Sequence, residues 1–103
     1  MVQLVYITVG TPEEAHRIAA ALVEARIAAC ANLIEGMKSV YRWEGEICKD
    51  EETILIAKTT TDQVDRLKAV VCSLHSYECP CIVCLPVSGG HDPFLQWVAA
   101  EVE

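Results

Sequence analysis

The chain has 103 residues, of which 52% are hydrophobic and 22% are charged, and its formal net charge at pH 7 is −7. This length predicts a single domain with one core, spanning residues 1–103. The acidic balance argues against nucleic-acid binding, which depends on clustered Lys and Arg, and no apolar run approaches the length of a membrane span.

The first part of the chain predicts a strand, a helix and a long second strand. Val2–Val9 is a nearly unbroken run of β-branched and aromatic residues, which is typical of a central strand. Thr11–Glu14 supplies an N-cap hydroxyl, a first-turn proline and the carboxylate of a capping box for a helix. Cys30–Trp43 follows as a long strand, one side of which carries Met37, Ser39, Tyr41 and Trp43.

The middle of the chain predicts a connection, a third strand and a second helix. Lys49–Glu52 has the composition of a solvated connection, and Thr53–Thr60 is typical of a strand that runs antiparallel to the second one. Thr61 and Asp62 offer caps for a helix that ends near His75.

The last part predicts a strand at Ile82–Val87, and Asp92–Pro93 reads as the cap and first-turn proline of a short helix. The order is therefore βαββαβ with an added helix. We expect an α+β, ferredoxin-like split βαβ sandwich, in which an antiparallel sheet carries two helices on one face. The other face of the sheet then needs burial against further copies of the chain.

The first ten residues lack the charged start, apolar centre and cleavage site of a secretory signal, so we expect a cytoplasmic protein. Its six cysteines should then remain free thiols. Cys30, Cys72 and Cys84 are predicted packing residues, because buried free cysteine behaves as a small hydrophobe. Cys48, beside Lys49 in the predicted connection, should be the most exposed thiol.

The segment from Leu74 to Cys84 carries the densest set of metal-ligating side chains. His75, Glu78, Cys79 and Cys81 are competent ligands for copper or zinc, although their spacing matches no standard zinc motif. If residues 79 and 81 lie on one side of a strand, both thiols face one ion. The alternative is that both thiols pack on the strand face and that His75 interacts with exposed carbonyls at the helix end.

Two further features have both a binding and a structural interpretation. Tyr41 and Trp43, on one face of the long strand, either stack on a ligand or anchor a subunit interface, and we favour the interface between copies of the chain. Lys58 shares a face with Ile54 and Ile56, so its ammonium pairs with a carboxylate such as Glu52 or Glu78, or lies in a cleft that holds a small anion.

The combination of several segments resembles the CutA family. The most distinctive are Ser39–Ile47, which contains Tyr-x-Trp-x-Gly-x-Ile, and Leu74–Pro80, which reads Leu-His-x-Tyr-Glu-x-Pro. The resemblance covers almost the whole chain. It implies a trimer of ferredoxin-like subunits, an association with tolerance to divalent cations, particularly copper, and no enzymatic activity. Members usually carry a glutamate where this chain has Cys81, which shifts a ligand at this position towards soft metals.

Three classes of function follow. The first is a cytoplasmic homotrimer that binds copper or another divalent metal ion and has no obligatory cofactor. The second is a trimeric signalling scaffold, similar to nitrogen-regulatory PII proteins, that receives a small metabolite or a partner protein at clefts between subunits. The third is an enzyme like the acylphosphatases, which is disfavoured because Val9–Pro12 is a helix cap and not an arginine-containing phosphate loop.

Overall fold

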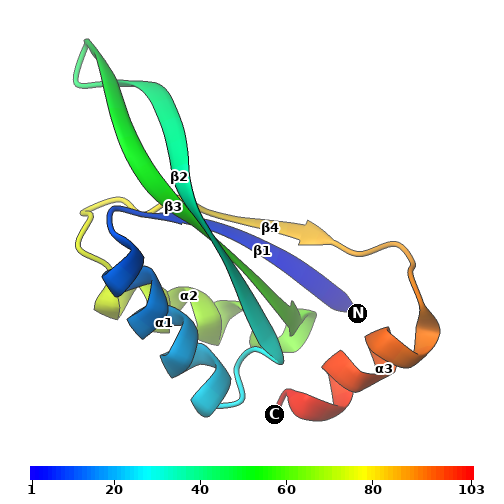
Figure 1. Ribbon diagram of the computed structural model, residues 1–103. Coiled ribbons are helices and arrows are strands. Elements are labelled where there is room, and N and C mark those ends of the chain that lie inside the picture. The colour runs from blue at the N-terminus through cyan, green and yellow to red at the C-terminus, as the bar shows by residue number, and fades with distance from the viewer.

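The computed structural model describes residues 1–103 and confirms the predicted ferredoxin-like α+β order with an added C-terminal helix (Figure 1). All strand pairs are antiparallel, and the strand order in the sheet is β2-β3-β1-β4. The elements are β1 (Val2–Val9), α1 (Pro12–Glu24), β2 (Cys30–Trp43), β3 (Glu46–Thr60), η1 (Thr61–Gln63), α2 (Val64–Leu74), β4 (Ile82–Pro86) and α3 (Asp92–Glu101).

Helices α1 and α2 cover one face of this sheet, and the hydrophobic core lies between the two layers. Alternate residues of β1 and β3 point into the core, as the period of two in a strand requires. The fully buried side chains come from both layers: Val5, Ile7, Val9 and Leu55 from the sheet, and Ile18, Leu22, Leu67 and Val71 from the helices.

The start of α1 confirms half of the predicted capping box. The Thr11 hydroxyl accepts a hydrogen bond from the backbone N–H of Glu14 at 3.2 Å, so the N-cap is formed. The Glu14 carboxylate is used elsewhere, because it accepts a hydrogen bond from the Ser76 hydroxyl at 3.1 Å. The first turn of α1 is thereby tied to the segment that follows α2.

The caps predicted for the other two helices are wrong. Thr61 and Asp62 lie in a separate 3-10 turn, where Asp62 accepts from the Thr60 hydroxyl, so neither side chain caps α2. Asp92 is the first residue of α3, and His91 stands at its N-cap without a side-chain hydrogen bond. None of the helices combines the length and apolarity needed to cross a bilayer.

Strands β2 and β3 continue beyond the sheet as a two-stranded ribbon, residues Met37–Glu52, which projects from the body of the molecule (Figure 1). The predicted solvated connection at Lys49–Glu52 is therefore wrong, since these residues pair with β2 inside β3. The actual turn is the two-residue link Glu44–Gly45, whose φ angles of 50° and 82° fit the tight hairpin turn that matches strand twist. Charged residues are tolerated here because the ribbon is solvent-exposed.

The ribbon bends away from the sheet at a β-bulge. Ile34 pairs with Ile54 and Met37 pairs with Glu52, so three steps along β2 correspond to two along β3. Gly36 has a φ of 79°, the left-handed conformation that glycine adopts without strain. One extra residue in β2 therefore turns the ribbon out of the plane of the sheet.

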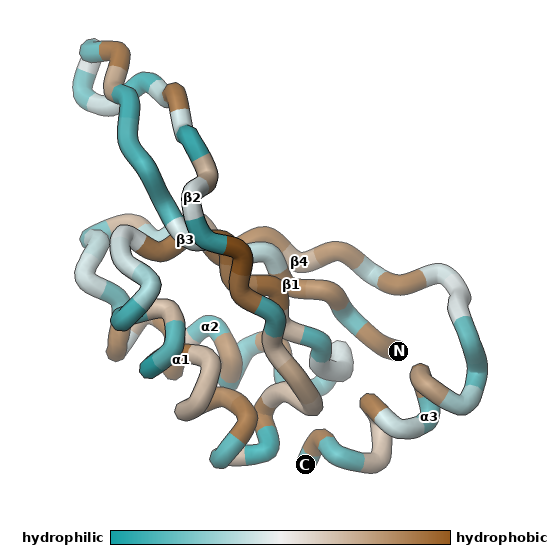
Figure 2. The backbone as a smooth tube through the Cα atoms, viewed as in Figure 1, coloured by the Kyte–Doolittle hydropathy of each residue, from teal (hydrophilic) through white to brown (hydrophobic).

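The sheet face opposite the helices, here called the open face, has no covering layer within the chain. Figure 2 shows hydrophobic residues along β1 and β4 and where β2 crosses β3, while much of the β3 arm of the ribbon is hydrophilic. The large hydrophobic side chains that are exposed on the open face and on the ribbon are Ile34, Val40, Tyr41, Trp43, Ile47, Val83 and Leu85. A monomer rarely exposes so many, so this surface requires an explanation.

Candidate functional site

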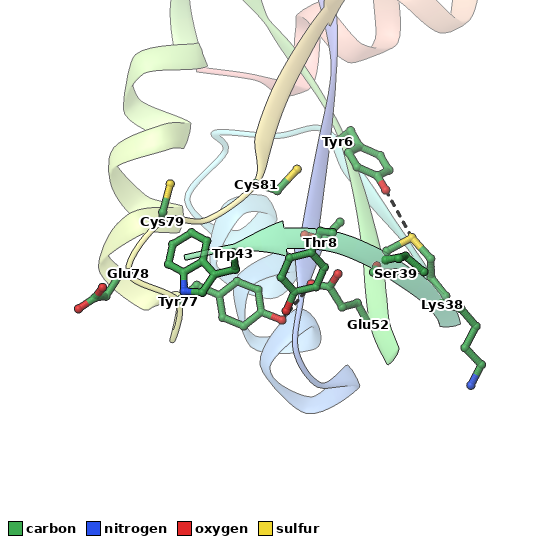
Figure 3. A pocket seen from close by; sticks show the side chains of 13 residues that line it. Tyr6, Thr8, Lys38, Ser39, Trp43, Glu52, Tyr77, Glu78, Cys79 and Cys81 are labelled. Atoms are coloured by element: carbon green, nitrogen blue, oxygen red, sulfur yellow. Dashed lines mark hydrogen bonds between the residues drawn. The ribbon is translucent and has the colours of Figure 1, made fainter. Parts of the chain in front are cut away.

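A cavity of about 700 Å³ lies where the ribbon bends over the open face (Figure 3). Its walls come from β1, from the ribbon and from the segment between α2 and β4. The predicted side of β2, with Met37, Ser39, Tyr41 and Trp43, lines it, and Lys38 and Val40 from the other side reach it as well. The full lining is Tyr6, Thr8, Met37, Lys38, Ser39, Val40, Tyr41, Trp43, Glu52, Tyr77, Glu78, Cys79 and Cys81.

His75 holds the segment after α2 against the sheet. Its Nε2 lies 2.8 Å from the carbonyl oxygen of Thr8 in β1, and its Nδ1 accepts a hydrogen bond from the backbone N–H of Tyr77 at 3.1 Å. These two bonds define the neutral tautomer with the proton on Nε2. The ring is completely buried, and both nitrogens are engaged with the backbone, so it has no free lone pair for a metal ion.

Tyr77 and Glu52 connect this segment to the ribbon. The Tyr77 hydroxyl donates to Glu52 Oε2 at 2.9 Å, and Figure 3 shows the two side chains meeting at the cavity. Burial, and then the adjacent carboxylate, raises the pKa of Tyr77 well above its ordinary value. A Cβ atom at Gly10 would lie 3.2 Å from the Tyr77 hydroxyl oxygen, so glycine leaves room for the ring.

The other two tyrosines of the cavity also donate their hydroxyl protons within the chain. Tyr41 donates to Asp50 on the facing strand of the ribbon, which raises the pKa of Tyr41 to about 12. Tyr6 donates to the sulfur of Met37 at 3.4 Å, the contact drawn as a dashed line in Figure 3. The cavity therefore presents aromatic rings, and the phenolic hydroxyls are already engaged.

Cys79 and Cys81 flank Pro80 and both line the cavity, Cys79 exposed and Cys81 half-buried. The expectation that a strand places them on one side is wrong, because both precede β4, which begins at Ile82. Proline lacks the N–H that a strand would use, and this delays the start of the ladder. Glu78 is exposed, and in Figure 3 its carboxylate points away from the cavity.

The predicted exposure of two other thiols is reversed. Cys72 is exposed, because it lies about 100° around α2 from the buried Val71 and thus on the solvent side. Cys48 is half-buried, because it lies in β3 directly opposite Tyr41 and not in a loop. Cys30 and Cys84 are half-buried, and Cys84 packs against the core as predicted.

The donor set predicted for a metal, His75, Glu78, Cys79 and Cys81, is not assembled by one chain. No group of three or more His, Cys, Asp or Glu side chains converges on a common point. A second cavity of about 260 Å³ is lined by Glu35, Glu51 and Glu52 among others, but these do not form such a group either. The two thiols beside Pro80 are the soft donors that the main cavity offers.

Lys58 does not meet the carboxylate that the sequence led us to expect. Its ammonium donates to Asn32 Oδ1 on the open face, and it lines neither of the two cavities. Asn32 lies next to Lys58 in the register of β2 and β3, whereas Glu52 is bound to Tyr77. A small-anion site at Lys58 stays a prediction.

Sequence reasoning missed the contributions of Tyr6, Thr8, Glu52 and Tyr77 to the site. The alternation in β1 placed Tyr6 and Thr8 on the face away from the core, which was an available signal. No such signal existed for Glu52, because its run of charged neighbours has the composition of a loop. The direction of the Tyr77 side chain depends on the hydrogen bond between its backbone N–H and His75, which no local sequence pattern predicts.

The chain matches the family model described as CutA1 divalent ion tolerance protein over residues 3–101. It is 47% identical over 98 residues to the divalent-cation tolerance protein CutA of Thermus thermophilus, with 95% of both chains covered. Protein CutA of Homo sapiens is 40% identical over 102 residues, which are 99% of this chain and 57% of the human protein. The chain spans about half the length of the plant and human relatives it matches, for example 52% of the Arabidopsis thaliana protein.

Solved structures agree with these relatives. The chain superimposes on the divalent cation tolerance protein (Cut A1) of Thermus thermophilus with a TM-score of 0.98 at 45% identity, over the whole of both chains. The periplasmic divalent cation tolerance protein CutA of Archaeoglobus fulgidus gives a TM-score of 0.96 at 39% identity, again over the whole of both chains. The likeness therefore extends to the ribbon as well as to the sheet and helices.

The role of His75 predicts a stability effect. His75→Ala removes the partners of two backbone groups, each of which costs about 1–3 kcal/mol if left unsatisfied and buried. Urea unfolding at fixed protein concentration should show this loss. Ser76→Ala, which removes one hydrogen bond of an exposed residue, is the control. A loss for His75→Ala no larger than that for Ser76→Ala would contradict the assignment.

The Tyr41 contact predicts a pH effect. In a spectrophotometric titration of the folded protein, Tyr41 should ionise near pH 12, and Asp50→Asn should return its pKa towards the ordinary value of 10. The folded chain holds this proton more tightly than the unfolded chain. Stability from the contact is thus complete below pH 10 and is lost as the pH rises to 12. An unchanged titration in Asp50→Asn would show that the contact is not formed.

Proposed function

Because the chain belongs to the CutA1 divalent ion tolerance family, we propose that it acts in the tolerance of metal ions by binding them directly, with copper as the preferred ion. The observation that carries this proposal is the placement of Cys79 and Cys81 at one wall of the main cavity. Thiolates select soft ions such as copper(I) over hard ones. The metal ion is the cargo of the protein, with no resident cofactor.

His75 and Glu78 have different roles in this proposal. His75 positions the thiol-bearing segment, because its two hydrogen bonds attach that segment to β1. Glu78 supplies negative charge near the entrance, since its carboxylate is exposed and directed outward. Two thiols suffice for copper(I) in linear coordination, and a third donor for other ions comes from a neighbouring copy of the chain.

We further propose that the working form is a homotrimer. A two-stranded ribbon without a covering layer is marginally stable in water, yet this one continues from Met37 to Glu52. Both sheet edges, β2 and β4, are unpaired within the chain. The open face would supply the centre of the interface through Ile34, Val83 and Leu85, and Tyr41 and Trp43 would lie at its border with the cavity.

The role we propose is binding without catalysis, in the cytoplasm. The three phenols of the cavity and the carboxylate of Glu52 are engaged in hydrogen bonds within the chain, which suits a binding site. All six cysteines are free thiols, as a reducing compartment would keep them. Relatives carry names from other compartments, chloroplastic in Arabidopsis thaliana and periplasmic in Archaeoglobus fulgidus.

A second candidate function is a trimeric scaffold of the PII kind, which receives a small metabolite or a partner protein. The observation that favours it is the size of the main cavity, about 700 Å³, which is in the range of small-molecule sites and far larger than a metal ion needs. The two functions differ in their ligands, so binding measurements separate them.

Copper(I) titration of the reduced protein against a competing chelator tests the metal proposal. Cys79→Ser with Cys81→Ser should abolish the tight binding. The matched control is Cys72→Ser, which removes an exposed thiol from the helix layer and should leave that binding unchanged. Equal losses in both variants would mean that the thiols bind copper adventitiously.

The molecular mass in solution tests the trimer. Val83→Glu with Leu85→Glu places two charges on the open face and should dissociate the oligomer, as seen by light scattering coupled to gel filtration. Leu74→Glu is the control, since Leu74 is equally exposed but lies at the end of α2. A monomeric parent protein, or a trimer that survives the double substitution, would contradict the proposed interface.

A further inference from the structure

We propose that the main cavity binds a small organic ammonium ion between its aromatic side chains and the carboxylate of Glu52. This inference deepens the second candidate function, the scaffold that receives a metabolite, by naming the class of ligand. It does not depend on whether the thiols bind a metal. Three features of the cavity support it: a buried carboxylate without a cationic partner, aromatic rings that are not stacked on another ring, and the absence of available cationic donors.

Glu52 is a buried carboxylate without a cationic partner. Only 8% of the residue is exposed, and its one side-chain partner is the neutral hydroxyl of Tyr77. The chain forms three ion pairs between a Lys or Arg side chain and a carboxylate, Arg26–Glu101, Lys38–Glu51 and Lys68–Asp65, and Glu52 takes part in none of them. A buried charge is costly unless an opposite charge compensates it, so a cation in the cavity would relieve this cost.

Three aromatic side chains of the cavity are not stacked on another ring. Tyr6, Tyr41 and Trp43 line the cavity, and none of them takes part in either of the two ring pairs of the chain, which are His75–Tyr77 and Phe94–Trp97. Ring faces are electron-rich and attract ammonium groups, most strongly when water is excluded. Figure 3 shows the hydroxyl of Tyr77 meeting the carboxylate of Glu52.

The cavity is poorly suited to an anion. Its single cationic side chain, Lys38, is paired with Glu51, and the hydroxyls of Tyr6, Tyr41 and Tyr77 already donate within the chain. Burial, and then the Glu52 carboxylate, raise the pKa of Tyr77, and the hydrogen bond to Asp50 raises that of Tyr41, so a carboxylate lies next to each of these two phenols. A cation is therefore the complementary ligand.

An organic cation fits better than a bare metal ion. No group of three or more His, Cys, Asp or Glu side chains converges here, so a strongly hydrated ion would find too few ligands to replace its water. An alkylated ammonium ion is weakly hydrated and fills space. The apolar lining from Met37, Val40 and Trp43 would pack against its carbon atoms while Glu52 compensates its charge.

Choline is a suitable probe, and 3,3-dimethylbutan-1-ol is its neutral analogue of the same shape. Calorimetric titration at constant ionic strength should show that choline binds at least about tenfold more tightly than the alcohol. Glu52→Gln keeps an acceptor for Tyr77 but removes the charge, so it should weaken choline by about tenfold and leave the alcohol unaffected. Glu24→Gln, an exposed glutamate of α1, is the matched control and should change neither.

A second variant and the copper(I) assay separate choline binding from metal binding by the thiols. Trp43→Leu should weaken choline, and because Trp43 borders the proposed interface, this variant is compared with the parent at equal oligomer mass. Cys79→Ser with Cys81→Ser should bind choline like the parent even if copper(I) binding is lost. Equal affinity for choline and the alcohol would overturn the proposal, because the cavity would then be only hydrophobic. Absence of choline binding by the intact oligomer would also overturn it, since a neighbouring copy would then occupy the cavity and supply the cation for Glu52.

Discussion

The two longest strands extend well beyond the helices that cover them, and most of the molecule's surface properties follow from this mismatch. Helices α1 and α2 bury one face of the sheet, while β2 and β3 run on for another seven or so residue pairs without cover. The projecting ribbon and the uncovered face meet at an angle. A cavity forms in that angle, and hydrophobic residues remain exposed on both sides of it.

The segment between α2 and β4 closes the cavity on the remaining side. It has no regular structure, yet it is attached at short intervals: Ser76 to Glu14, His75 to Thr8, and Tyr77 to Glu52. These contacts reach α1, β1 and β3, so the segment is a rigid wall although it is a loop. Rigid placement of side chains from a loop is what binding sites require, because ordering them on binding would reduce affinity.

Much of the fold could be predicted from local patterns, and less of the site. β1 and β2 have the bounds that their residue patterns indicated, because both are long runs of strand-forming residues. Lys49–Glu52 was misassigned because charged residues look alike in a loop and in an exposed ribbon. His75 was read as a possible ligand since its residue type fits a metal, but its ring is bound by two backbone groups, the nearby N–H of Tyr77 and the carbonyl of Thr8, which is 67 positions away in the sequence. Such long-range hydrogen bonds leave no periodic trace in a sequence.

The bulge at Glu35 and Gly36 determines more than the direction of the ribbon. Side chains alternate along a strand, so the one extra residue decides which set of β2 side chains faces inward after it. Without that insertion, Tyr41 and Trp43 would turn to the opposite face, and Val40 and Arg42 would take their places. The same residues in the same order would then line the site with a guanidinium where an indole now lies. The chemical character of the cavity therefore depends on the number of residues in β2 at the bulge as well as on which residues follow it.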